Sequence, residues 1–159
     1  MSEAAPEQQS GTFSIEKLYV KDLSLEVPHA PAIYLERANP QIGLQMQTQA
    51  QALDEANYEV SVTATVTASI AEQDNKVMFL VEATQAGVFQ VRNLPHEAVE
   101  QVLSVMCPNI LYPYLREVVS DASVRAGFAP VLLNPVNFET LYVQQKMQQQ
   151  AAATPETTH

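Results

Sequence analysis

The chain has 159 residues, enough for one domain of ordinary size, and 47% of them are hydrophobic, which excludes a wholly disordered protein. Its 18 acidic residues outnumber 8 basic ones, and the formal net charge is −10. Such a polyanion disfavours phosphate backbones and anionic membrane surfaces, so we expect no nucleic-acid partner and expect a basic protein or peptide instead.

Cys107 is the single cysteine, so an intramolecular disulfide framework is excluded, as is usual in a reducing compartment. The first ten residues are polar and acidic, and they do not form a secretory signal. No apolar run approaches the roughly 18–20 residues that span a membrane. We therefore expect a cytoplasmic protein without membrane insertion.

Both ends of the chain have compositions that bury too little apolar surface to offset chain entropy. The sequence predicts a disordered N-terminal tail over 1–11 and a disordered C-terminal tail over 149–159. One domain, 12–148, lies between them.

The domain begins with hydrophobic residues at every second position, a period typical of strands. The first such segment, Phe13 to Val27, changes phase between Val20 and Leu23, which predicts a β-bulge. An irregular, proline-containing connection over 28–40 follows.

Three more strands are predicted after this connection. The strongest alternates apolar residues with Ser, Thr and Glu over its whole length, and a polar turn over 72–76 joins it to the next. Short connections of this kind imply an antiparallel sheet. The predicted segments are Ile42 to Gln47, Tyr58 to Ile70 and Val77 to Ala83.

A helical period begins after Pro95, and its apolar residues recur every three or four positions. Pro108 and Pro113 predict a kink or break near Cys107, because proline removes a backbone donor. Gly127 ends the segment.

A connector over 128–136 leads to a second helix, Phe138 to about Gln148, which Asn137 can cap. The predicted fold class is α+β, with four antiparallel strands followed by a long and a short helix. Such a sheet leaves apolar surface over in a monomer, which suggests an oligomer.

The sequence lacks the residue patterns that usually mark a catalytic site. The three histidines, His29, His96 and His159, are scattered and do not have the spacing of a metal site. Cys107 could act as a nucleophile, but it lies on the apolar stripe without a neighbouring base in the sequence, so a buried side chain is the favoured interpretation.

The connection over 28–40 contains three sizeable apolar side chains, Ile33, Tyr34 and Leu35. Either they cover the core or they line a groove. The apolar side of the following strand would enlarge such a groove, and an extended apolar patch usually marks a binding site.

Several segments in one register, spanning 12–148, resemble the SecB export chaperones. The resemblance is carried by Cys-Pro-Asn-Ile-Leu-Tyr-Pro-Tyr-Leu-Arg-Glu at 107–117, Pro-Val-Asn-Phe at 135–138, and the strand segments 19–31 and 58–68. It implies no enzymatic activity, no cofactor and a homotetramer, built as a dimer of dimers, in which long helices pack between the dimers. The matching residues are Val99, Leu103 and Met106.

The resemblance also implies a function, which is to hold precursor proteins unfolded without ATP and to deliver them to the translocation ATPase SecA. In the family, an acidic surface of the sheet receives a short, basic, zinc-bearing tail of SecA. The zinc belongs to SecA, so no metal is expected here. The residues that match this surface are Asp22, Glu26, Leu80 and Glu82.

Unfolded clients of the family bind in a groove beside the crossover loop and the last helix. The family's loop carries a tryptophan where this chain has Ala38, and the chain contains no tryptophan. The residues that match the groove are Tyr34, Ile42, Leu44, Met46, Phe138, Leu141 and Tyr142.

Three alternatives stay open at this point. The first is a SecB-like chaperone dedicated to one client, such as an antitoxin. The others are a small enzyme or ligand-binding protein that uses Cys107, and a purely structural oligomer.

Overall fold

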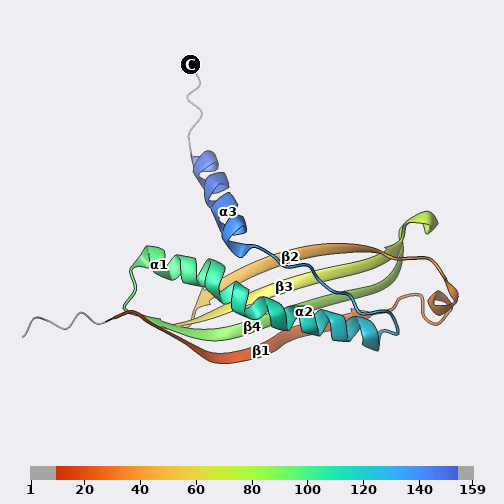
Figure 1. Ribbon diagram of the computed structural model, residues 1–159, viewed down its shortest axis with the longest axis horizontal. Coiled ribbons are helices and arrows are strands. Elements are labelled where there is room, and N and C mark those ends of the chain that lie inside the picture. Colours follow the sequence, from red (N-terminus) through yellow and green to blue (C-terminus); the bar gives the residue numbers. More distant parts are fainter. Residues whose placement is uncertain (1–9, 154–159) are drawn as a thin grey trace, which may run out of the picture.

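The alternation of the sequence over Asn57–Ile70 is reproduced in strand β3, where every second side chain from Val60 to Ile70 is fully buried. In this computed structural model, which describes residues 10–153, β3 lies between two antiparallel partners, and the strand order is β1-β4-β3-β2 (Figure 1). The predicted four-stranded antiparallel sheet is confirmed. The strands are β1 (Thr12–Glu26), β2 (Gln41–Ala52), β3 (Asn57–Ile70) and β4 (Lys76–Arg92).

Strand β1 contains the bulge that its change of phase predicts. Its register against β4 shifts between Val20 and Asp22, which leaves Lys21 as the extra residue. A second shift, between Ile15 and Lys17, was not predicted.

Strand β4 extends to Arg92, so the predicted end at Ala83 is wrong. The residues that follow Ala83 include Thr84, Gln85 and Gly87, which interrupt the hydrophobic run. They nevertheless form a strand because β4 has a partner on each side, β1 and β3, and both register with it as far as Gln90.

The prediction was a kink or a break near Cys107, and the long helix continues through this residue without a break but changes its helix type just before it. Helix α1 (His96–Gln101) passes into a π-helical segment, η3 (Val102–Met106), and then into α2 (Cys107–Arg125). A π turn changes the hydrogen-bond register, and such turns accommodate residues that disturb an α-helix. Here the π-helical segment ends at Met106, two residues before Pro108, which lacks a backbone donor.

Helix α3 (Phe138–Ala153) starts as predicted, with the Asn137 Oδ1 atom accepting a hydrogen bond from the backbone N–H of Thr140 at 3.0 Å. It continues past the predicted end near Gln148. Residues 149–153 of the predicted disordered C-terminal tail belong to this helix, so the prediction is wrong over that part. The rest of that tail and residues 1–9 of the predicted N-terminal tail lie outside the described residues, and their disorder stays a prediction.

The core lies between the sheet and the long helix. Helix α2 packs on β3 and β4 (Figure 1), and its buried side chains include Leu111, Leu115 and Val119. Ile33, from a short 3₁₀ turn (η1, Ala32–Leu35), is fully buried in the same core. Of the three apolar side chains in that loop, Ile33 therefore covers the core, whereas the other two are exposed. None of the helices in residues 10–153 is long and apolar enough to span a membrane.

We expect Leu115→Ala to lower the free energy of unfolding by about 2–5 kcal/mol, because Leu115 is fully buried under the helix. Leu35→Ala is the matched control, since Leu35 is 84% exposed, and it should change stability by less than about 0.5 kcal/mol. Urea unfolding followed by circular dichroism at one protein concentration measures both. Equal effects would contradict this packing.

Candidate functional site

A cavity of about 720 Å³ lies between the crossover loop (27–40), the first half of β2 and the connector (126–137). Tyr34 holds the loop and the connector together, because its hydroxyl donates a hydrogen bond to the carbonyl oxygen of Ala126 at 2.8 Å. Its ring also stacks on Phe128, with 5.4 Å between the ring centroids, and Phe128 stacks on Phe79 of β4 at 4.9 Å. The wall of this cavity is therefore a chain of aromatic contacts.

The connector is fixed to α2 by hydrogen bonds. The backbone N–H of Val131 donates to Ser123 Oγ at 2.9 Å, and the Tyr112 hydroxyl donates to the carbonyl oxygen of Asn134. These contacts hold an extended, non-helical segment beside the cavity without a strand partner.

A second cavity, of about 400 Å³, lies between β2 and α3. Strand β2 joins the two, because Ile42, Leu44 and Met46 occupy one face of it. They pair with buried residues of β3, so they point to the helix side of the sheet. We call the two cavities and this face of β2 the β2 groove.

The structure brings the predicted client residues together along the β2 groove. Tyr34, Ile42 and Leu44 line the first cavity, and they are 48%, 44% and 42% exposed. The second cavity is lined by Met46, Phe138, Leu141 and Tyr142.

Phe138 requires a correction. It is only 2% exposed and packs edge-on against Tyr112, so it supports the groove from beneath and offers almost no surface to a ligand. Ala38 contributes no more than a methyl group to the wall of the first cavity.

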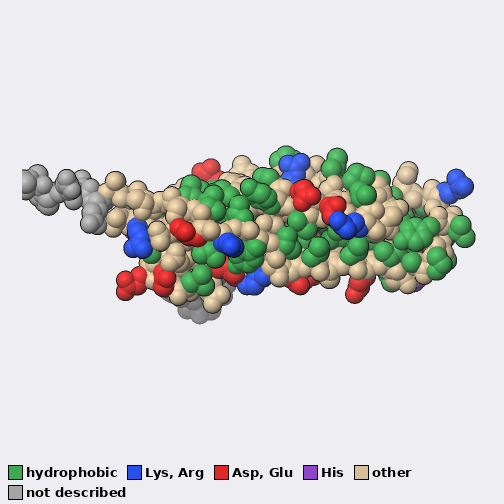
Figure 2. Space-filling model, turned by 90° about the horizontal axis from the view of Figure 1, so that it is seen from below, with side chains coloured by type: hydrophobic (Ala, Val, Ile, Leu, Met, Phe, Trp, Pro, Cys, Tyr) green, Lys and Arg blue, Asp and Glu red, His purple; other side chains and the backbone are tan. Residues whose placement is uncertain are grey.

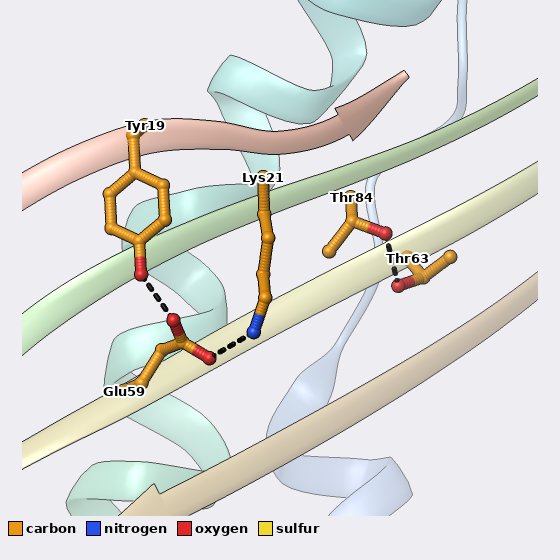
Figure 3. A network of polar contacts seen from close by, with 5 residues as sticks. All are labelled: Tyr19, Lys21, Glu59, Thr63 and Thr84. Carbon is orange, nitrogen blue, oxygen red and sulfur yellow. Dashed lines mark hydrogen bonds and ion pairs between the residues drawn. The ribbon is translucent and has the colours of Figure 1, made fainter. Parts of the chain in front are cut away.

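The predicted acidic residues meet on the opposite face of the sheet. The register pairs Asp22 with Thr84 and Glu26 with Leu80, and Glu82 lies between these positions on β4. Thr63 and Thr84 exchange a hydrogen bond on the same side at 2.8 Å (Figure 3). We call Asp22, Glu26, Leu80 and Glu82 the acidic face. Among residues 10–153, its three carboxylates form no ion pair.

A polar cluster that the sequence did not reveal lies on this outer side of the sheet. Glu59 of β3 pairs with Lys21 at 2.6 Å and accepts a hydrogen bond from the Tyr19 hydroxyl (Figure 3). The hydrogen bond from Lys21 is the main reason that the pKa of Glu59 is lowered. Burial, followed by the bond to Glu59, raises the pKa of Tyr19 to about 12. Residues 19 and 59 are far apart in the sequence, and only the strand register places them together.

The predicted oligomer residues lie on the long helix. Val99 and Leu103 are half-buried, and Met106 is 42% exposed. Beyond the helix, the edge strand β1 leaves a row of side chains on the helix side of the sheet uncovered, and Figure 2 shows hydrophobic side chains along this edge. The exposed members of the row are Ile15, Val20, Leu23 and Leu25.

Comparison with known proteins gives a consistent result. Residues 6–150 match the family model described as preprotein translocase subunit SecB. A protein-export protein SecB from Methylobacillus flagellatus is 55% identical over 99% of this chain and 98% of its own length. One from Nitrosomonas europaea is 59% identical over 94% of this chain and 92% of its own.

The fold is similar to a solved structure of the Mycobacterium tuberculosis SecB-like chaperone in complex with a peptide from the HigA1 antitoxin. The TM-score is 0.63, and the match covers 79% of this chain and 91% of the other. At 18% sequence identity, this likeness extends to the fold alone.

Cys107 lies at the start of α2 and is fully buried. Burial raises the pKa of its thiol to about 12, so the thiolate that a nucleophile needs is disfavoured at neutral pH. The geometry therefore fits a packing residue.

Cys107 should react with dithionitrobenzoate at pH 8 more than ~100-fold faster in denaturant than in the folded protein, because unfolding restores an ordinary thiol pKa. Absorbance of the released thiolate measures both rates. Similar rates in the two states would contradict the buried setting and would favour a reactive cysteine.

Proposed function

The chain belongs to the SecB family, and from that premise we propose that it holds unfolded precursor proteins without ATP and delivers them to the SecA ATPase. The observation that carries the proposal is identity of more than half the residues, over nearly the full length, with relatives named protein-export proteins. The β2 groove and the acidic face supply a separate surface for each of the two tasks.

Client holding is assigned to the β2 groove. Exposed apolar side chains there can bury apolar groups of an unfolded chain, and the flexible Met46 adapts to different shapes. Strand β2 is an edge strand, so its outer backbone groups are free to pair with an extended peptide. Contacts of these kinds tolerate many client sequences.

The assembly is proposed to be a homotetramer, a dimer of dimers. The uncovered hydrophobic row on β1 and the unpaired edge of that strand support association with a second copy. Val99, Leu103 and Met106 are assigned to the contact between dimers. Several grooves on one particle raise the affinity for a long unfolded chain by about 10²–10⁴-fold over one groove.

The acidic face is proposed as the contact for the basic tail of SecA. Its three carboxylates have no cationic partner in the described part of the chain, so their charge is available to a ligand. Exposed ion pairs contribute only about 0–1 kcal/mol each, so several must act together. A cytoplasmic location follows from a role that precedes translocation.

A chaperone dedicated to one antitoxin is not favoured. The similar mycobacterial structure contains an antitoxin peptide, but its likeness reaches the fold alone, whereas the relatives at more than half identity are named for export. The retained acidic face also argues for delivery to SecA. The enzyme alternative loses support from the burial of Cys107.

Leu44→Glu should weaken binding of an unfolded precursor by about tenfold or more, because it places a charge in the apolar groove. Gln45→Glu is the matched control, since the neighbouring residue points to the other face of β2. Fluorescence anisotropy with a labelled, reduced precursor measures both affinities. Equal losses in the two variants would place the client site elsewhere.

Asp22→Lys and Glu82→Lys should each weaken SecA binding by about threefold to tenfold while client binding persists. Glu72→Lys, in the turn before β4, makes the same charge change away from the acidic face. Surface plasmon resonance at two salt concentrations measures the effect, which should shrink at high salt. Parallel loss of client and SecA binding would indicate a folding defect or a wrong site.

A further inference from the structure

Lys21 is a cation placed directly beside the acidic face. It precedes Asp22 at the bulge of β1 and lies on the same outer side of the sheet, as its bond to Glu59 demonstrates. A free lysine here would pair with the neighbouring carboxylates or repel a basic ligand. Either outcome would reduce the attraction of the acidic face for a cationic partner.

Glu59 restrains this lysine. The Lys21 Nζ atom lies 2.6 Å from Glu59 Oε1, after reaching across β4 to β3, and the two side chains are 50% and 18% exposed. Glu59 is itself held by the Tyr19 hydroxyl, which donates to its other oxygen (Figure 3). The carboxylate is thus fixed from one side and pairs with the ammonium from the other.

The ion pair between Lys21 and Glu59 decides where the lysine ammonium lies relative to the acidic face. Glu59 pairs with Val88 of β4, whereas Asp22 pairs with Thr84 of the same strand and Glu26 with Leu80. Glu59 and the acidic face therefore lie on opposite sides of the Lys21 position along the sheet. In Figure 3, Lys21 extends across β4 towards Glu59, and the Thr63–Thr84 pair lies to one side. The ion pair draws the ammonium away from the acidic face.

We propose that Glu59 is a positioning residue for the acidic face, which holds Lys21 aside and neutralises it so that a cationic segment meets Asp22, Glu26 and Glu82 without competition. This inference rests on the proposed role of that face in SecA binding. Glu59 acts here through Lys21 and makes no contact of its own with the ligand.

A double-mutant cycle tests the inference, with the zinc-loaded C-terminal tail peptide of SecA as the probe and isothermal titration calorimetry as the measurement. Glu59→Gln removes the charge but keeps an oxygen that can accept from Tyr19. It should weaken binding by about threefold to tenfold. Lys21→Gln should bind as tightly as the wild type or more tightly. The double variant should return to within about twofold of Lys21→Gln.

The effect of Glu59→Gln on peptide binding, measured with Lys21 present and with Lys21 replaced, distinguishes a positioning role from direct contact with the ligand. If Glu59→Gln weakens binding equally with and without Lys21, Glu59 touches the ligand itself and the inference is overturned. If Glu59→Gln has no effect while the wild type binds, the pair is irrelevant to the face and the inference is again overturned.

Two controls keep the result interpretable. Client binding in the β2 groove and the thermal midpoint of unfolding should stay the same in all variants. A merely structural role of Glu59 would instead lower the midpoint, and Lys21→Gln would not rescue peptide binding. A wild-type protein that fails to bind the peptide would overturn the proposed SecA contact together with this inference. If the wild-type protein binds the peptide, a negative result with the variants overturns only the inference about Glu59 and leaves the proposed SecA contact standing.

Discussion

The rest of the structure depends on one constraint, which is that a single helix is too narrow to cover a four-stranded sheet. A helix with its side chains is about 10 Å across, and neighbouring strands lie about 4.8 Å apart, so one helix covers about two strands. Helix α2 covers β3 and β4, the two central strands. Both edge strands are left with partly exposed hydrophobic side chains, on β1 from Ile15 to Leu25 and on β2 at Ile42 and Leu44. The proposed assembly and the proposed client site are two uses of this uncovered surface.

The two edges differ in what lies beside them. Strand β2 is flanked by the crossover loop, the connector and α3, which form walls around cavities of about 720 and 400 Å³. The helix-side row of β1 lines neither of these two cavities, and it is the surface proposed to pack against a second copy. The carboxylates of the acidic face lie on the other side of the sheet. A client in the groove and a cationic segment on the acidic face would therefore be separated by the sheet itself.

Sequence reasoning succeeded where a local pattern determines the structure. The alternation of β3, the bulge near Lys21 and the cap at Asn137 depend on neighbouring residues, and all three are confirmed. Sequence reasoning failed where contacts with distant parts of the chain determine the structure. Strand β4 continues through polar residues because it has strands on both sides, and a π-helical segment lies where a kink or break near Cys107 was predicted.

The candidate site shows the same division. The acidic face and most of the β2 groove were expected from resemblance and are brought together by the strand register. The burial of Phe138 depends on its contact with Tyr112, and the pairing of Glu59 with Lys21 crosses a whole strand. Neither has a signal in a single sequence.

The central claim is that this protein assembles through one edge of its sheet and holds unfolded chains through the other. Size-exclusion chromatography with light scattering, with and without a stoichiometric unfolded precursor, tests it most directly. The account predicts a particle of about four times 17.5 kDa that gains the mass of one unfolded chain and ignores the folded form of the same precursor. A monomer that ignores unfolded chains would contradict both the assembly and the function.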